Sequence, residues 1–217
     1  MGIECSSLCQ RPSCRDVDVS EIITALIPNS ISKDEINALP IRRYEGPIVL
    51  VESTAEVERA LADFAGERLL GFDTETRPTF KVGQKHPVAL AQVATHRAVY
   101  LFQLHRMDCA PVLREMLQSA SAKAGVGIGD DIKALRELFA FEPRGIADLG
   151  AIARKKGYER SGVRALAAMF LGFRIPKGTK TSNWAAAHLS PQQIAYAATD
   201  AWACRELYLR FETLGLI

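Results

Sequence analysis

Hydrophobic residues fall in short runs separated by polar and glycine-containing segments, a pattern typical of a mixed α/β domain. Apolar runs predict strands at residues 47–51, 68–75, 88–94, 98–102, 123–128 and 145–149. Between and after them, apolar residues recur every three or four positions. This spacing predicts helices at residues 53–64, 111–120, 129–139, 151–156, 163–171 and 191–214.

The order of these elements predicts the fold class. The runs at 88–94 and 98–102 are separated by three residues, so we expect an antiparallel hairpin that pairs with strand 68–75. We therefore predict an α/β fold whose mixed sheet has an antiparallel hairpin at one side and parallel strands at the other, flanked by helices, with strand 68–75 near the middle. Residues 46–217 form this domain, and residues 1–45 are predicted to be an arm that packs on it, of unknown role.

The composition is that of an ordinary globular protein. The chain has 217 residues, of which 48% are hydrophobic and 24% charged, so disordered and fibrous classes are excluded. No run approaches the roughly 18 apolar residues of a membrane span, and the amino terminus has no secretory signal pattern. We therefore expect no membrane partner and a cytoplasmic location, or a nuclear one in a eukaryotic cell. Cys5, Cys9 and Cys14 lack the spacing of a disulfide framework or zinc site, and we expect reduced thiols.

Positive charge is concentrated in one part of the chain. The formal net charge of +2 says little about partners, but the stretch from Arg154 to Lys180 holds eight basic residues and a single acid, Glu159. Such a stretch favours a polyanionic partner such as a nucleic acid backbone. A solvated basic face without a partner is the alternative.

Two acids end the apolar run at residues 68–75. In a strand, positions i and i+2 point to the same face, so Asp73 and Glu75 stand side by side. Two ionised acids this close repel each other unless a cation lies between them, which indicates a site for a hard metal ion. A solvated strand end is the alternative. Gly71 lies on the same face and is expected to leave room below such a site.

Three further residues can be placed near this pair by periodicity. Asp131 borders the buried face of its predicted helix, whereas Asp130 lies on the outer side and is expected to cap the helix. Tyr196 and Asp200 are four residues apart and share the packed face of the last helix. A buried carboxylate needs a partner, which a metal ion would supply. The alternatives are that Asp131 is a plain N-cap and that Tyr196 is a core residue.

Three segments together resemble a known family. The strings from Phe72 to Thr76, Gly125 to Leu135 and Tyr196 to Ala201 are similar to the three ordered motifs of the DnaQ-like DEDD exonucleases. The tyrosine four residues before the last acid resembles the DEDDy branch, which includes ribonuclease D and the exonuclease domain of the Werner syndrome protein. The second and third strings, with Ser182-Asn183-Trp184, are most similar to the Werner-type domain. The resemblance extends from about residue 47 to the carboxyl end.

The resemblance implies a ribonuclease-H-like fold and two Mg²⁺ or Mn²⁺ ions. It also implies stepwise release of nucleoside 5′-monophosphates from DNA or RNA 3′ ends. Carried over by position, Asp73, Glu75 and Asp200 hold one ion, while Asp73 also contacts the second, on which Asp131 acts through its water shell. Tyr196 orients the attacking water, because an ordinary tyrosine pKa of about 10 makes it a poor base at neutral pH. Carboxylates suit these ions, which prefer oxygen ligands.

Contacts to the nucleic acid are less well marked. Thr74 and Thr76 flank Glu75, and Gln92 lies on the strand beside the first motif. Trp184 is a candidate for stacking on a base, with core packing as the alternative. Asp130 directly precedes Asp131 and is its rival as the third acid.

Two other functions remain open from the sequence. Gly125-x-Gly127-x-Gly129 before a helix is a weak signal of a nucleotide-binding α/β protein. A catalytically inactive nucleic-acid-binding module on the same fold is the second alternative. Because the chain ends just past the third motif, we expect a bare catalytic module, with protein partners or self-association responsible for targeting.

Overall fold

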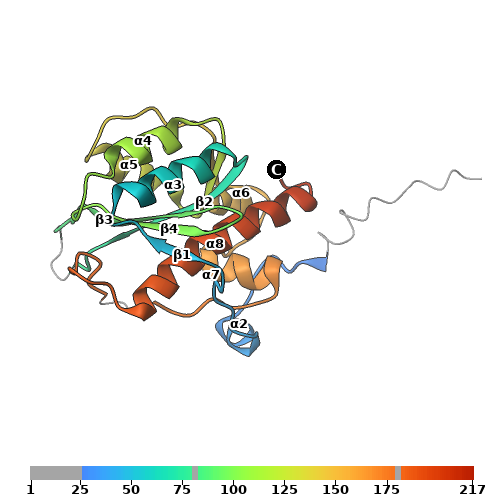
Figure 1. Cartoon of the computed structure of the whole chain (residues 1–217). Coiled ribbons are helices and arrows are strands. Elements are labelled where there is room, and N and C mark those ends of the chain that lie inside the picture. The colour runs from blue at the N-terminus through green and yellow to red at the C-terminus, as the bar shows by residue number, and fades with distance from the viewer. Residues whose placement is uncertain (1–25, 80–82, 179–181) are drawn as a thin grey trace, which may run out of the picture.

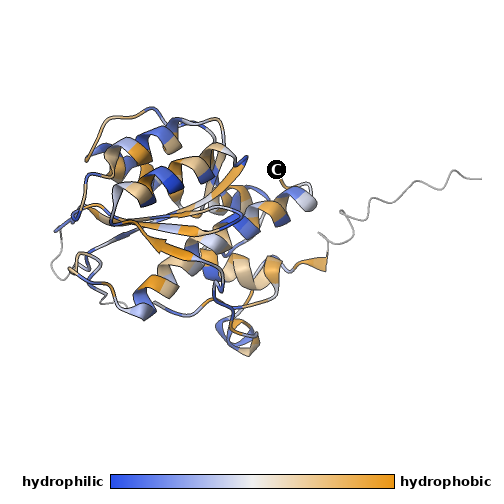
Figure 2. Cartoon of the chain, viewed as in Figure 1, coloured by the Kyte–Doolittle hydropathy of each residue, from blue (hydrophilic) through white to orange (hydrophobic). Residues whose placement is uncertain are grey.

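The computed structural model describes residues 26–79, 83–178 and 182–217 (Figure 1). The predicted thiols Cys5, Cys9 and Cys14 lie outside these ranges. The described chain forms three layers, with a sheet between two layers of helices. Figure 2 shows hydrophobic residues along the strands and on many helical turns that face them, with hydrophilic residues on outward turns.

The sheet has six strands in the order β1-β4-β3-β2-β5-β6. β3 pairs antiparallel with both β2 and β4, β1 lies parallel to β4, and β5 lies parallel to β2 and β6. This confirms the predicted mixed sheet, with β2 in its interior. The strands are β1 (Ile48–Leu50), β2 (Leu69–Thr76), β3 (Val88–Ala94), β4 (Val99–Gln103), β5 (Ala122–Gly125) and β6 (Ile146–Asp148).

Helices cover both faces of the sheet. In Figure 1, α3, α4 and α5 lie on one face, and α6, α7 and α8 on the other. Within the described ranges, none of the helices combines the length and the apolar character needed to cross a membrane. The helices are α2 (Lys33–Ala38), α3 (Thr54–Ala65), α4 (Ala110–Gln118), α5 (Ile128–Arg136), α6 (Leu149–Lys155), α7 (Val163–Leu166), the π-helical η1 (Ala167–Leu171) and α8 (Pro191–Thr213).

Side chains of β2 alternate between the two helical layers. Leu70 and Phe72 belong to the apolar core beneath α3, α4 and α5. Leu69 belongs to a second core that includes residues of α6 and α8. The odd-numbered positions of β2 therefore face α8, and Asp73 and Glu75 continue that series.

Gly71 allows α8 to approach β2 closely. A Cβ atom built on Gly71 would overlap the backbone carbonyl oxygen of Ala201 and crowd the Cβ of Arg205. The room that the missing side chain of Gly71 leaves below the acids is occupied by the backbone of α8. The small buried residues Ala197 and Ala198 extend the close contact along the helix.

Substituting Gly71→Ala is therefore expected to lower the free energy of unfolding by at least about 2 kcal/mol, since the added methyl group meets backbone that cannot rotate away. Urea denaturation of the purified variant measures this change. The matched control is Gly129→Ala in α5, where a Cβ meets nothing within 4 Å. An unchanged midpoint for Gly71→Ala would contradict the close contact.

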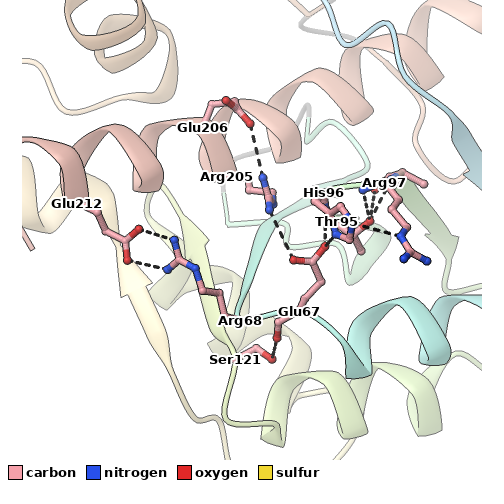
Figure 3. Close-up of polar contacts among 10 residues, drawn as sticks. Glu67, Arg68, Thr95, His96, Arg97, Ser121, Arg205, Glu206 and Glu212 are labelled. Carbon is pink, nitrogen blue, oxygen red and sulfur yellow. Dashed lines mark hydrogen bonds and ion pairs between the residues drawn. The ribbon is translucent and has the colours of Figure 1, made fainter.

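Two ion pairs link α8 to the start of β2 (Figure 3). The nearly buried carboxylate of Glu67 lies 3.6 Å from a guanidinium nitrogen of Arg205 and also accepts a hydrogen bond from the backbone N–H of His96. Arg68 and Glu212 form a bidentate pair at 2.8 Å, but Arg68 is well exposed, so this pair contributes little. Removing Arg205 would leave Glu67 without its charged partner, which is costly for a buried acid.

Lys123 is a buried cation on β5. Its side chain has no exposed surface, and Nζ donates a hydrogen bond of 2.8 Å to the backbone carbonyl of Ser119. Burial lowers the pKa of Lys123 from 10.5 to about 8. The folded protein thus holds this proton more weakly than the unfolded chain, and stability rises as the pH increases from about 8 to 10.5.

Substituting Lys123→Met is expected to raise the free energy of unfolding at pH 7 by about 1 to 2 kcal/mol, because one pKa unit corresponds to about 1.4 kcal/mol and the lost hydrogen bonds offset part of the gain. Denaturation curves at pH 7, 8, 9 and 10 should also lose the rise in stability above pH 8. Lys155→Met, at an exposed position of α6, is the control and should change neither quantity. A loss of stability at pH 7 would contradict the prediction.

The chain around the second acidic motif differs from its prediction. The strand expected at 123–128 ends at Gly125, because Gly127 adopts a left-handed conformation with φ of 75° and serves as the N-cap of α5. The helix begins at Ile128, so Asp130 already lies within its first turn. The expectation that Asp130 caps this helix is therefore wrong.

Two other helical predictions need correction. The helix predicted at residues 129–139 is shorter, because α5 ends at Arg136, and Leu138 beyond it is 44% exposed. The helix predicted at 163–171 is divided, since α7 ends at Leu166 and continues as the π-helical turn η1.

The described part of the amino-terminal segment lies against the domain. Ile31 and Ile36 are buried in the core that contains Phe211 of α8. Ile41 forms a parallel bridge with Arg174, and the backbone N–H of Tyr44 donates a hydrogen bond of 3.0 Å to the hydroxyl of Thr199. Its division from the domain at residue 46 stays a prediction.

Candidate active site

Three carboxylates from two elements converge above β2. Asp73 and Glu75 project from the face of β2 that α8 covers, and Asp200 projects from α8. One carboxylate oxygen from each of the three lies within 4.8 Å of the others. The close approach of α8 at Gly71 brings Asp200 within reach of the strand.

Local sequence fixes where α8 begins. Ser190 and Gln193 form a reciprocal capping box, and Pro191 occupies the first turn, where its missing N–H leaves no bond unmade. From this start, Tyr196 and Asp200 lie one turn apart on the side that faces the sheet. Sequence periodicity alone was sufficient to predict this arrangement.

The three carboxyl groups strongly affect each other's ionisation. Burial, followed by the charges of Asp200, Asp131 and Glu75, raises the pKa of Asp73 well above its usual range. Burial and the charges of Asp200 and Asp131 raise the pKa of Glu75 to about 8. Without a cation, the folded protein therefore resists full ionisation of this group at neutral pH.

Asp200 has an unsatisfied oxygen. Burial raises its pKa to about 7, although a hydrogen bond from Tyr196 and the charge of Arg164 act in the opposite direction. Its Oδ1 atom is buried and has no hydrogen-bond partner among the described residues. Buried carboxylate oxygens are normally paired, so this atom and the cluster around it fit a divalent cation bound by oxygen ligands.

Tyr196 is held as a hydrogen-bond donor. Burial, then the charge of Asp200 and the hydrogen bond to that carboxylate, raise the pKa of Tyr196 far above its ordinary value. The phenol therefore stays protonated at neutral pH. Gly178 packs against its ring, where a Cβ would lie 2.7 Å from a ring carbon, and the ring centroid of Trp184 is 6.1 Å away.

Asp131 lies on the other side of β2. It is partly buried near the start of α5 and accepts a hydrogen bond from the hydroxyl of Thr74, whose side chain points away from Asp73. Asp131 does not belong to the three-carboxylate group, but its charge raises the pKa of Asp73. Asp130 is exposed, so the predicted inward and outward orientations of the two acids are confirmed.

Comparison with known proteins identifies the family. Residues 48–215 match the sequence model of a family described as 3′-5′ exonuclease. The chain belongs to this exonuclease family. It is 31% identical over 204 residues to the bifunctional 3′-5′ exonuclease/ATP-dependent helicase WRN of Mus musculus. The aligned region covers 88% of this chain but only 14% of the mouse protein. The chain thus corresponds to a small part of that relative.

Solved structures of exonucleases share the fold. The EXO domain of Nibbler from Aedes aegypti superposes with a TM-score of 0.70 at 24% identity, covering 82% of this chain and 93% of that chain. RNase D from Trypanosoma brucei in complex with RNA U12 superposes with a TM-score of 0.66 at 19% identity, covering 78% of this chain and 63% of that chain. The predicted ribonuclease-H-like fold and DnaQ-like superfamily are confirmed.

Two predicted nucleic-acid contacts of this exonuclease domain are buried. Gln92 lies opposite Asp73 on β3 with no exposed surface, and neither amide atom has a hydrogen-bond partner among the described residues. It therefore has no surface for a nucleic acid and stands beside the acids instead. Trp184 is 5% exposed and belongs to an apolar core with residues of α8, so the alternative of core packing holds for most of its surface.

The two threonines differ in exposure. Thr76 is exposed at the end of β2, whereas the hydroxyl of Thr74 donates its hydrogen bond to Asp131. The side chain of Thr76 can therefore contact a nucleic acid. Only the backbone of Thr74 faces the site, as predicted from strand alternation. The roles of all these residues stay predictions.

A pocket of about 500 Å³ opens beside Tyr196. Arg43 and Gly178 line this pocket but lie outside the three motifs, so no motif in the sequence marks them. The lining residues are Arg43, Pro176, Lys177, Gly178, Ser182, Trp184, Ser190, Pro191, Gln192, Gln193, Ala195 and Tyr196.

The raised carboxyl pKa values predict how the metal-free exonuclease domain responds to pH. Because the folded state binds these protons more tightly than the unfolded chain, stability should fall as the pH rises from 4.5 to about 8. Asp200→Asn should flatten this fall, raise the Tm at pH 8 without metal, and reduce the increase in Tm caused by Mn²⁺. Thermal denaturation with EDTA and with Mn²⁺ measures both effects.

The control for this experiment is Glu115→Gln, at an exposed position of α4 in the opposite helical layer. It removes one negative charge at a distance from the cluster and should leave both the pH dependence and the Mn²⁺ effect unchanged. If Asp200→Asn behaved like Glu115→Gln, the electrostatic account of the cluster would be wrong.

Proposed function

We propose that the chain is a metal-dependent 3′-5′ exonuclease that releases nucleoside 5′-monophosphates from the 3′ end of a nucleic acid. The observation that supports this most is the convergence of Asp73, Glu75 and Asp200, with an unpaired buried oxygen on Asp200, in a domain of the 3′-5′ exonuclease family. Membership of that family supports a nuclease activity.

Asp73, Glu75 and Asp200 are proposed to hold one divalent ion. Asp73 is proposed to contact the second ion as well, and Asp131 to act on that ion through its water shell. Mg²⁺ and Mn²⁺ suit the all-oxygen donor set. When bound, two such ions lower the pKa of water and stabilise charge on the attacking and leaving oxygens at phosphorus. Thr74 orients Asp131 through its hydroxyl hydrogen bond, which leaves the second carboxylate oxygen of Asp131 available.

Tyr196 is proposed to position the attacking water. Its hydroxyl remains protonated, and its hydrogen bond to Asp200 places it at the edge of the carboxylate group. Since its single proton is donated to Asp200, the hydroxyl oxygen can accept a hydrogen bond from a water molecule without removing that water's proton. The packing of Gly178 against the ring restricts its movement, which favours one orientation of that water.

The pocket beside Tyr196 is proposed to receive the 3′-terminal nucleotide. Its walls combine the apolar surface of Trp184 with the cationic side chains of Arg43 and Lys177. A nucleotide offers an apolar base and an anionic phosphate to such walls. Whether the sugar is ribose or deoxyribose depends on contacts to the 2′-hydroxyl, so DNA and RNA ends are both proposed substrates.

Targeting is proposed to depend on other proteins or on self-association, and the location to be the cytoplasm or the nucleus. The T. brucei RNase D structure contains RNA, which supports a nucleic acid as substrate for this fold. All four acids and the tyrosine are present, which argues against a catalytically inactive binding module.

Substituting Asp73→Ala is expected to reduce hydrolysis by at least about 1,000-fold, corresponding to about 4 kcal/mol of transition-state stabilisation, since this acid is shared by both proposed ions. The assay uses 5′-labelled single- and double-stranded DNA and RNA, each with Mg²⁺ and with Mn²⁺. Successive shortening from the 3′ end identifies the polarity.

The adjacent acids provide a matched pair for the same assay. Asp131→Asn should lower the rate strongly, and the exposed Asp130→Asn should leave it within about threefold of wild type. Near-normal trimming by folded Asp73→Ala would contradict the mechanism. Binding of the oligonucleotides by the wild type without any hydrolysis would favour the inactive module instead.

A further inference from the structure

A second hollow, of about 560 Å³, is lined by residues of the amino-terminal arm and of the segment that leads into α7. The helices α2 and α7 are labelled in Figure 1. Helix α2 forms one wall, and the other walls come from residues on both sides of Gly162 together with Lys177. The lining residues are Lys33, Ile36, Asn37, Arg160, Gly162, Val163, Arg164, Ala165 and Lys177. The family match begins at residue 48, so α2 lies outside the matched region.

The lining combines positive charge with an apolar floor. Lys33, Arg160, Arg164 and Lys177 contribute four cations, and the residues that line this hollow include no acid. Ile36, Val163 and Ala165 form apolar surface between them. A nucleotide unit matches both features, because its base buries apolar surface and its phosphate binds cationic side chains. The volume lies within the usual range for a small-ligand pocket.

Helix α2 is held in place to present one face to the hollow. Ser32 and Glu35 form a capping box that fixes the start of the helix. Ile36 is buried, whereas Lys33 and Asn37, which are four residues apart and share a face of α2, are exposed. The exposed side chains of Lys33 and Asn37 therefore border the hollow rather than the core.

The hollow is joined to the candidate active site through two cations. Lys177 lines both this hollow and the pocket beside Tyr196. Arg164 is close enough to Asp200 for its charge to favour the ionised carboxylate, and its Nε atom is buried without a hydrogen-bond partner among the described residues. A strand whose 3′ end lies beside Tyr196 can therefore continue past Lys177 into the hollow.

We propose that α2, the segment 160–165 and Lys177 form a binding site for a nucleotide of the substrate strand upstream of its 3′ end. The base rests on the apolar floor, and the flanking phosphates contact Lys33, Arg160 and the other cations. The arm is thereby a nucleic-acid-binding element. This inference rests on the proposed function, because the strand bound here is the substrate of the carboxylate site.

Binding without metal tests the site independently of hydrolysis. Fluorescence anisotropy of labelled 12-nucleotide single-stranded DNA and RNA is measured in EDTA over a range of salt concentrations. Lys33→Ala should weaken binding about three- to tenfold and reduce the slope of log K against log salt by about 0.7, the value for one lost phosphate contact on a single strand. Asn37→Glu should weaken binding at least as much, because it adds a negative charge.

Lys156→Ala is the matched control. Lys156 is an exposed cation in the same basic stretch, but it does not line the hollow. Its removal should change Kd less than about twofold. Equal losses for Lys33→Ala and Lys156→Ala would show diffuse attraction by a basic face and overturn the proposal, as would unchanged binding by both Lys33→Ala and Asn37→Glu. Circular dichroism melting curves confirm that each variant is folded.

Hydrolysis provides a second readout. A mononucleotide ester, such as the p-nitrophenyl ester of thymidine 5′-monophosphate, has no upstream nucleotide to enter the hollow. Lys33→Ala should therefore leave its hydrolysis unchanged and lower kcat/KM for the 12-nucleotide strand. Equal losses on both substrates would overturn the proposal. If the wild type cleaves neither substrate, the proposed function fails, while the metal-free binding experiment still decides whether the hollow binds the strand.

Discussion

Repulsion among Asp73, Glu75 and Asp200 is the constraint on which the rest of the structure depends. Their oxygens lie within 4.8 Å of one another, and partial burial raises the pKa of each. Such a group opposes folding unless other contacts hold its elements together. The contact of α8 with β2 at Gly71 and the nearly buried Glu67–Arg205 pair provide that support from the far end of the strand.

The interface between α8 and β2 has two parts. One contributes packing that stabilises the fold, and the other carries the proposed catalytic groups. Toward the start of β2, α8 packs through apolar side chains and the Glu67–Arg205 ion pair, although Nε of Arg205 is buried without a hydrogen-bond partner among the described residues. Toward the end of β2, Gln92 and Asp200 retain buried polar atoms without partners among the described residues. Proteins tolerate such atoms where a ligand completes them, and binding of the proposed cation would restore the stability that these atoms cost.

The sequence predicted the parts of the site that lie within single elements. Strand alternation placed Asp73 and Glu75 together. Helical periodicity placed Tyr196 on the same face as Asp200, and it predicted that Asp131 points toward the core while Asp130 points outward. It could not predict contacts between elements. Gly71 proved to accommodate the backbone of α8, Gln92 proved to be enclosed, and the two hollows arise where segments distant in the chain meet. Periodicity reports which face is buried, but not what buries it.

At this site the positive charge of Arg164 acts on Asp200, but the two side chains do not form a hydrogen-bonded pair. Arg164 is near enough to Asp200 to influence its pKa, yet Nε of the arginine and Oδ1 of the acid both lack hydrogen-bond partners in the described part of the chain. Had the two formed a direct hydrogen-bonded pair, Asp200 would be less available to a cation and Arg164 less available to a phosphate. Because the two are not directly hydrogen-bonded, both charges stay available, as the proposed binding of a cation and of a phosphate requires. In the proposed upstream site, Lys33 and Arg160 line the same hollow as Arg164 and add positive charge there.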